Sequence, residues 1–189
     1  MDDTQAMNSD LEYRRHGNEI LQRYENDPYI RYMMGAKEQW AFIVDRIRVL
    51  LLRDEGGLYI DADARPIKPV STLPIWDRKD IDFVAGFRDP YRQGVALHRG
   101  ISLVDNTFLA SAKGGRIANR LVELYHSKAP KRDGHDIGCE ILANSREDVV
   151  WLNFRYVYAM EKHPETVFLH DDQNLGSWTI QRQIQFAER

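Results

Sequence analysis

The feature that most constrains this chain is the stretch from Asp45 to Asp63, which reads DRIRVLLLRDEGGLYIDAD. Residues 40–52 carry apolar side chains at helical spacing and on nearly every side, so the spacing predicts a mostly buried helix. Gly56-Gly57 then ends that helix, because glycine takes positive φ at no steric cost. Residues 58–63 alternate apolar and polar side chains, which predicts a short strand with one face in a core.

Polar side chains interrupt both elements in a pattern that indicates a binding site. Asp45 and Arg48 are at positions i and i+3, so they share one face of the helix and can form an ion pair. A buried ion pair is a poor source of stability, and it is better explained by a cleft that binds something polar. In the strand, Tyr59, Asp61 and Asp63 share the other, polar face. The two aspartates lie at the end of this strand, and open α/β sheets bind ligands at the ends of their strands.

The two carboxylates at the strand end predict a cation. Asp61 and Asp63 repel each other unless a proton or a cation lies between them. Ligands that are all oxygen suit Mn²⁺ or Mg²⁺, hard cations that also bind phosphate oxygens. A D-x-D pair alone is a weak signal, since two solvated turn aspartates give the same pattern. The whole constellation from Asp45 to Asp63 is much more specific.

Taken together, these residues carry a family resemblance. The run D-x-x-R-x-x-x-L-x-x-x-G-G-x-Y-x-D-x-D resembles the sugar-binding region of D-x-D glycosyltransferases. It is similar to that of glycosyltransferase family 32, the Och1-like and capsular-polysaccharide enzymes, and to the core of the clostridial glucosylating toxins. A looser similarity continues to Trp178. The resemblance implies a GT-A fold, a nucleotide-sugar donor (a UDP-sugar favoured over GDP-mannose), a divalent metal and retention of anomeric configuration.

The resemblance also implies roles for individual residues. Asp61 and Asp63 would form the catalytic centre and would bind Mn²⁺ or Mg²⁺ together with His170. The donor would be bound by Asp45, Arg48, Tyr59, Asn106, Ser177 and Trp178. Two of these assignments have an equal alternative. Asn106 could instead satisfy turn backbone, and His170 could be a lone surface side chain.

Composition sets broader bounds. The 189 residues suffice for one domain with a sizeable core, which we predict to span residues 1–189, with the polar residues 1–18 loosely held. A net charge of -3 gives no bulk attraction to nucleic acid. No apolar run approaches the ~20 residues of a membrane span. We therefore expect a cytoplasmic protein, in which any association with a membrane runs through a partner.

Patterns elsewhere in the chain predict the remaining elements. We expect short helices around Asp27-Pro28, a helix over 116–127, and an ambiguous tail, helical or extended, over 179–189. Further strands are predicted at 81–87, 101–112 and 166–170. With the resemblance, this order predicts an α/β fold of GT-A type, a central mixed sheet flanked by helices.

The predicted function is a metal-dependent retaining glycosyltransferase, which moves a hexose to a hydroxyl of a glycan, glycolipid or protein, as in polysaccharide biosynthesis. Such enzymes open with a strand of the type I-P-K-I-I-H-x-I-W, and nothing similar precedes Asp45. A catalytically inactive subunit that binds a sugar nucleotide or serves assembly therefore stays open. A nucleotidyltransferase would need a further carboxylate on a neighbouring strand and a Gly-Ser turn, and neither is evident. A structural domain without a ligand is disfavoured by the expected burial of Asp45 and Arg48.

Overall fold

The computed structural model describes residues 6–35, 40–61, 64–76, 81–87, 104–127, 149–152, 156, 164–170 and 182–185. Within this part of the chain, six strands form one sheet in the order β1-β8-β2-β5-β4-β6. These strands are β1 (Glu12–Arg15), β2 (Gly57–Ile60), β4 (Phe83–Phe87), β5 (Val104–Ser111), β6 (Val149–Leu152) and β8 (Arg182–Gln185). A separate two-stranded sheet pairs β3 (Ala64–Pro66) with β7 (Phe168–His170).

Strand direction makes the larger sheet mixed. β2 is antiparallel to both of its neighbours, β5 and β8. β1 is antiparallel to β8, β4 is antiparallel to β5, and β6 is parallel to β4. It follows that β1, β2, β4 and β6 run one way and end at the same edge of the sheet. The predicted α/β class, with a central mixed sheet flanked by helices, is confirmed.

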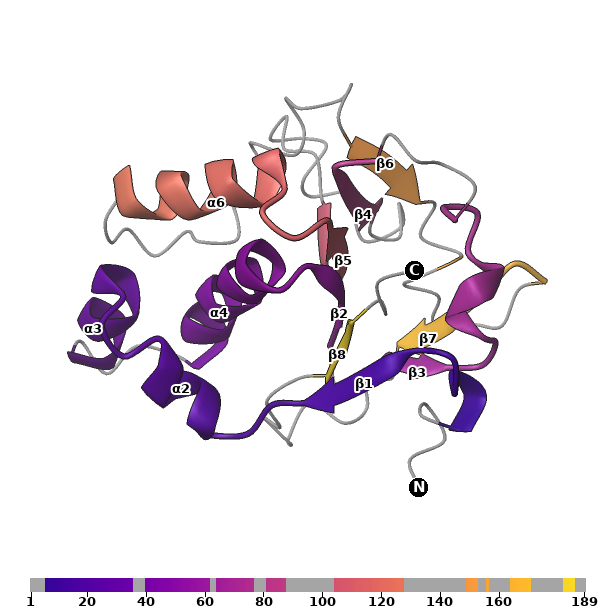
Figure 1. Ribbon diagram of the computed structural model, residues 1–189, viewed down its shortest axis with the longest axis horizontal. Coiled ribbons are helices and arrows are strands. Elements are labelled where there is room, and N and C mark those ends of the chain that lie inside the picture. Colours follow the sequence, from indigo (N-terminus) through magenta and orange to yellow (C-terminus); the bar gives the residue numbers. More distant parts are fainter. Residues whose placement is uncertain are drawn as a thin grey trace, which may run out of the picture.

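The helices form a layer on one face of this sheet (Figure 1). They are α2 (Glu19–Arg23), α3 (Pro28–Gly35), α4 (Trp40–Asp54) and α6 (Arg116–Ser127). Apolar side chains of all four helices pack with inward-facing residues of β2, β4, β5 and β6 into one core cluster. A second cluster lies on the opposite face, where β3, β7 and the short 3-10 helix η1 (Val70–Thr72) cover the sheet.

The predicted connection between α4 and β2 is confirmed. α4 ends at Asp54, and Gly56 and Gly57 follow with φ of 71° and 93°, the backbone region that glycine tolerates best. Gly56 also lies close to another turn, since a Cβ atom there would stand 2.5 Å from the backbone nitrogen of Lys113. One expectation for β2 is wrong. We expected one apolar and one polar face, whereas all four residues of β2 are buried, because α4 covers the face that carries Tyr59.

Part of the N-terminal region forms regular structure. We expected residues 1–18 to be loosely held, but Glu12–Arg15 form strand β1 and pair in register with β8. Asn8 is only 3% exposed, and its side-chain oxygen accepts a hydrogen bond from the backbone N–H of Val70 at 2.7 Å. In the ambiguous tail, residues 182–185 are extended, as β8. Both strands lack a local hydrophobic pattern. β8 pairs with β1 and β2, whereas β1 pairs only with β8 among the described residues.

Two aspartates cap the starts of α3 and α6. Asp27 accepts hydrogen bonds from the backbone N–H groups of Tyr29 and Ile30, at 3.1 and 3.2 Å, and so caps α3. Asp82, which directly precedes β4, accepts from the N–H groups of Arg116 and Ile117, at 2.8 and 2.7 Å, and so satisfies the start of α6. A carboxylate at this position also interacts favourably with the helix dipole.

Candidate functional site

The candidate site is a network of four polar side chains where α4 passes over the end of β2. An Nη atom of Arg48 lies 2.9 Å from an oxygen of Asp45, so the predicted ion pair within α4 exists. The same nitrogen lies 3.6 Å from Asp61 Oδ1, which joins the helix to the end of the strand. The hydroxyl of Tyr59 donates a hydrogen bond to the same Asp61 oxygen at 2.8 Å.

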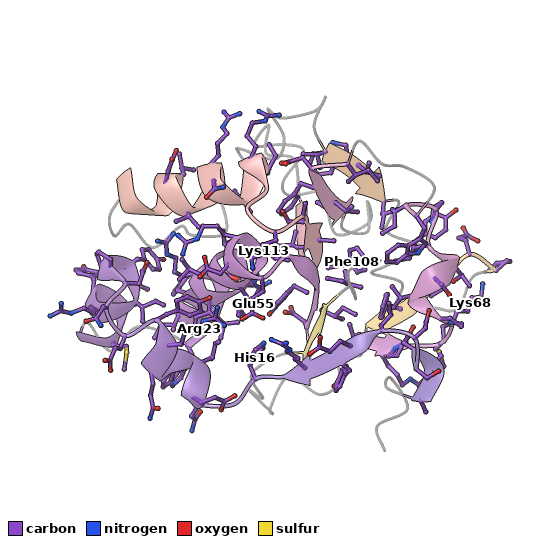
Figure 2. All side chains as sticks on the ribbon, viewed as in Figure 1. His16, Arg23, Glu55, Lys68, Phe108 and Lys113 are labelled. Carbon is purple, nitrogen blue, oxygen red and sulfur yellow. The ribbon has the colours of Figure 1, made fainter. Side chains whose placement is uncertain are left out.

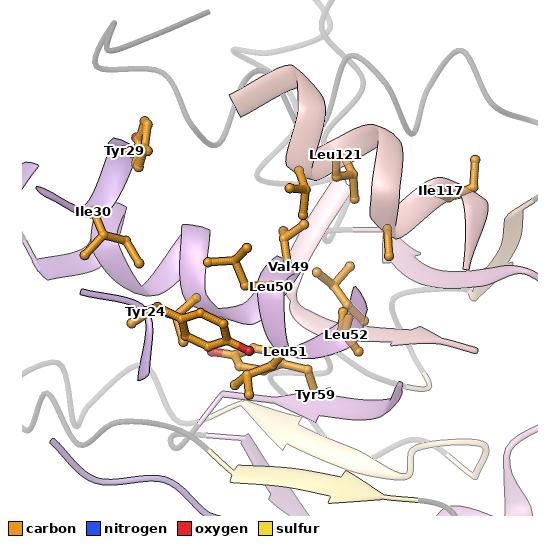
Figure 3. Packing of buried hydrophobic residues seen from close by; sticks show 14 of the residues in the cluster. Tyr24, Tyr29, Ile30, Val49, Leu50, Leu51, Leu52, Tyr59, Ile117 and Leu121 are labelled. Atoms are coloured by element: carbon orange, nitrogen blue, oxygen red, sulfur yellow. The ribbon is translucent and has the colours of Figure 1, made fainter. Parts of the chain in front are cut away.

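Tyr59 lies at the bottom of this network. Its side chain packs beside Leu51 on the sheet side of α4 (Figure 3), and the residue is only 1% exposed. The guanidinium carbon of Arg48 lies 4.8 Å from the centre of the Tyr59 ring, which is a cation–π contact. Burial raises the pKa of Tyr59 well above its usual range, and the nearby Asp61 carboxylate raises it further, although Arg48 opposes the change. The hydroxyl therefore stays protonated and remains a donor.

Exposure within the network increases toward the strand end. The side chain of Arg48 is 6% exposed, that of Asp45 11% and that of Asp61 22%. A ligand would therefore meet Asp61 first and the ion pair behind it. Carboxylates that accept hydrogen bonds and a guanidinium that donates them together suit a ligand rich in hydroxyl groups.

Backbone pairing places Asn106 at this edge of the sheet and His170 beside the D-x-D region. Ile60 pairs with Phe108, and Asn106 lies two residues before Phe108 in β5, so Asn106 is at the edge where β2 ends. His170 pairs with Ala64, the residue that directly follows Asp63. The β3–β7 pair thus brings a segment from late in the chain to the D-x-D region.

The predicted metal site is only partly visible in the described residues. Asp61 presents a carboxylate at the strand end, the type of oxygen ligand that Mn²⁺ and Mg²⁺ prefer. Asp63, Ser177 and Trp178 lie outside the described residues. Among the residues that are described, no group of three or more His, Cys, Asp or Glu side chains could hold a metal. The set of metal ligands therefore stays a prediction.

A second buried ion pair on α4 was not predicted. Arg46 is 0% exposed, and its Nη2 lies 2.7 Å from Asp27 Oδ2. Its Nη1 donates to the backbone carbonyl oxygen of Val122 in α6, at 2.8 Å. Arg46 therefore ties α4 to the capped start of α3 and to α6. The sequence feature that could have indicated the burial of Arg46 is its position inside a helix that is apolar on nearly every side.

A third polar cluster holds the carboxyl end of α4. The hydroxyl of Tyr24 donates a hydrogen bond to Asp54 at 3.0 Å, and Arg53 Nε donates one to the same carboxylate at 2.6 Å. Partial burial tends to raise the pKa of Asp54, but these two hydrogen bonds and the charge of Arg53 outweigh it, and the pKa is lowered. Next to this cluster, Glu55 forms ion pairs with Arg14 and Arg23, and Figure 2 shows Arg23 beside Glu55.

A small hollow of about 180 Å³ lies apart from these polar networks. It is lined by Ile75, Trp76, Ile81, Val84, Ala110, Ser111 and Ala112. None of the predicted site residues lines it, and its lining carries no charged side chain. We assign it no role in the predicted chemistry.

Comparisons with known proteins add little to this geometry. No protein-family model matches the chain, and no curated protein matches it. The chain is similar to a solved structure titled "PaToxG Glycosyltransferase", with 21% identity and a TM-score of 0.44. That similarity covers 65% of this chain and 42% of the other. None of the helices in the described residues is long and apolar enough to cross a membrane.

Proposed function

We propose that this chain binds a nucleotide-sugar donor at the end of β2 and transfers its hexose to a hydroxyl of a glycan, glycolipid or protein. The observation that carries the proposal is the network in which Arg48 lies between Asp45 and Asp61, 2.9 and 3.6 Å from their oxygens. Burying these charges opposes folding, and a role in binding would explain why the chain buries them nevertheless. The network lies at the carboxyl end of a strand, where ligands bind in open α/β sheets.

In this proposal each side chain of the network that faces the ligand has a role. Asp45 and Arg48 bind hydroxyls of the donor hexose, with Arg48 supplying a rigid, planar set of donors. Asp61 accepts hydrogen bonds from sugar or ribose hydroxyls and assists the metal. Asn106, from the adjacent strand, contributes to the donor site from the same sheet edge.

The metal belongs to the same proposal. Asp63, with Asp61 and His170, would hold Mn²⁺ or Mg²⁺, and the ion when bound would neutralise charge on the leaving diphosphate. The pairing of His170 with Ala64 supports placing the late segment beside Asp63. Ser177 and Trp178 would bind the diphosphate from the segment that follows. We expect retention of configuration and nominate no protein nucleophile.

Calorimetry and a transfer assay test the proposal in sequence. Titration with UDP and with GDP, each with and without Mn²⁺, should show metal-dependent binding of one nucleotide. Turnover with the sugar of that nucleotide should then show transfer. Binding without turnover would favour an inactive sugar-nucleotide-binding subunit, and no binding of either nucleotide with metal would contradict the proposal.

A matched pair of variants makes the assay specific to the site. Asp61 and Asp54 each accept a tyrosine hydroxyl, at 2.8 and 3.0 Å, but only Asp61 lies at the end of β2. Asp61→Asn should abolish nucleotide-sugar binding, whereas Asp54→Asn should leave it unchanged. Equal binding by the two variants would place the site elsewhere.

A further inference from the structure

We propose that Tyr59 is a positioning residue that does not touch the donor and instead holds Asp61 and Arg48 in place, an inference that rests on the proposed function. The resemblance implies that this tyrosine binds the donor itself. Its surroundings indicate a different role, which the following contacts support.

The hydroxyl of Tyr59 fixes the carboxylate of Asp61. It donates to Asp61 Oδ1 at 2.8 Å, from a position two residues earlier in the chain. Asp61 follows the last residue of β2 and is more exposed than the other members of the network, at 22% for its side chain. A partly exposed side chain at a strand end has several rotamers to choose from. A hydrogen bond from a rigid, buried phenol selects among them.

The ring of Tyr59 fixes Arg48 in turn. The guanidinium carbon lies 4.8 Å from the ring centre, so the flat ring provides a surface that orients the planar cation. Arg48 then reaches Asp45 at 2.9 Å and Asp61 at 3.6 Å. One side chain thereby sets the relative positions of a charged group on α4 and another at the end of β2.

Burial keeps Tyr59 itself away from any ligand. The residue is 1% exposed and belongs to the core cluster beneath α4, where Figure 3 shows it beside Leu51. Sites that bind polar substrates need side chains held to a fraction of an ångström by such supporting contacts. Tyr59 supplies that support for both charges.

The chain contains a natural control, Tyr24. This residue is also buried, at 8% exposure. Its hydroxyl also donates a hydrogen bond to an aspartate, Asp54, at 3.0 Å. Asp54 is the last residue of α4, whereas Asp61 lies at the end of β2. Removing either hydroxyl deletes the same kind of hydrogen bond, but only the removal at Tyr59 loosens a residue of the proposed site.

The test compares Tyr59→Phe with Tyr24→Phe in steady-state transfer and in nucleotide-sugar binding. Tyr59→Phe keeps the ring and its contact with Arg48, so the protein should fold. We expect kcat/KM to fall about tenfold per folded molecule, as loss of one charge-assisted hydrogen bond predicts. Tyr24→Phe should keep the wild-type kcat/KM. Equal kcat/KM in wild type and Tyr59→Phe, or equal losses in the two variants, would overturn the proposal.

A second readout does not depend on activity. In protein labelled with ¹³C at aspartate side chains, the Asp61 carboxylate signal, assigned with Asp61→Asn, should shift in Tyr59→Phe and stay in place in Tyr24→Phe. An unmoved signal in Tyr59→Phe would overturn the positioning role. If the wild-type protein transfers no sugar, the proposed function fails, and this signal still decides whether Tyr59 holds Asp61.

Discussion

Two arginines that lie close together in α4 have different roles. Arg46 and Arg48 are both buried and both paired with an aspartate. Side chains that lie two positions apart in a helix point in directions about 200° apart. The two arginine side chains therefore leave α4 on opposite sides. Arg46 reaches Asp27 and the backbone of α6, both inside the helical layer. Arg48 reaches the end of β2, where the proposed site lies.

Lysine substitutions should separate these two roles. Arg48→Lys keeps the charge but loses the planar group that reaches two carboxylates, so transfer should fall at least about tenfold with little change in Tm. Arg46→Lys loses the bond to the carbonyl of Val122 or to Asp27, and Tm should fall by roughly 5 °C. Its transfer per folded molecule should match wild type. Thermal unfolding and a transfer assay on both variants measure the difference. If Arg48→Lys lowered Tm but left transfer per folded molecule unchanged, the ion pair with Asp45 would have only a structural role.

Asp54 gives a prediction about pH. Its pKa in the folded protein lies below the ordinary value of 3.8, so its contribution to stability is present above that pH and is lost as the pH falls through the folded pKa. Wild type should therefore exceed Asp54→Asn in free energy of unfolding at about pH 7, and the difference should shrink by about pH 2. Urea unfolding at both pH values measures it. A difference that stayed constant would mean that the charge of Asp54 contributes nothing.

At the scale of elements, the sequence predicted what local patterns determine. The helix over residues 40–52 and the glycine break after it follow from periodicity and from glycine chemistry, and both are present as α4 and its end. The helix over 116–127 matches α6, and the short helices expected around Asp27-Pro28 are present as α2 and α3. Each of these signals lies within a few residues of the structure it predicts.

Other elements depend on contacts that no local pattern encodes. β1, β3 and β8 contain four, three and four residues, and strands this short form only where a distant partner supplies hydrogen bonds. The candidate site divides in the same way. The spacing of Asp45 and Arg48 predicted their ion pair. The burial of Tyr59 could not be predicted, because α4 covers the strand face that period-two alternation suggested was open.

The close approach of two turns can be tested with a pair of glycines. Gly56 and Gly114 both have positive φ, 71° and 68°. A Cβ atom at Gly114 would meet nothing within 4 Å, whereas one at Gly56 would meet the backbone of Lys113 at 2.5 Å. Gly114→Ala should therefore lose about 1 kcal/mol through backbone strain alone. Gly56→Ala should lose at least about 3 kcal/mol, because α4 and β2 must also move away from the turn before α6. Chemical denaturation measures both, and equal losses would mean that the contact is easily relieved.

At the scale of the whole molecule, the last described strand lies inside the sheet. β8 comes from residues 182–185, yet it pairs with β1 on one side and β2 on the other. β1 has no other strand partner among the described residues. The N-terminal and C-terminal parts of the chain therefore meet next to β2, the strand that ends at the candidate site.

Truncation should show how much of the molecule depends on that strand. Deleting residues 182–189 removes the ladder between β1 and β2, and the free energy of unfolding should fall by about 3 kcal/mol. β1 would keep its contact through Arg14, whose Nη1 lies 3.2 Å from Glu55, but not its backbone pairing. Amide hydrogens of residues 12–15 should then exchange at least about tenfold faster, while those of α4 stay protected. Deleting only residues 186–189 leaves β8 intact and serves as the control. If both truncations left exchange at residues 12–15 unchanged, β1 would be held by its side chains rather than by β8. In that case the sheet beside β2 would be assembled without the end of the chain.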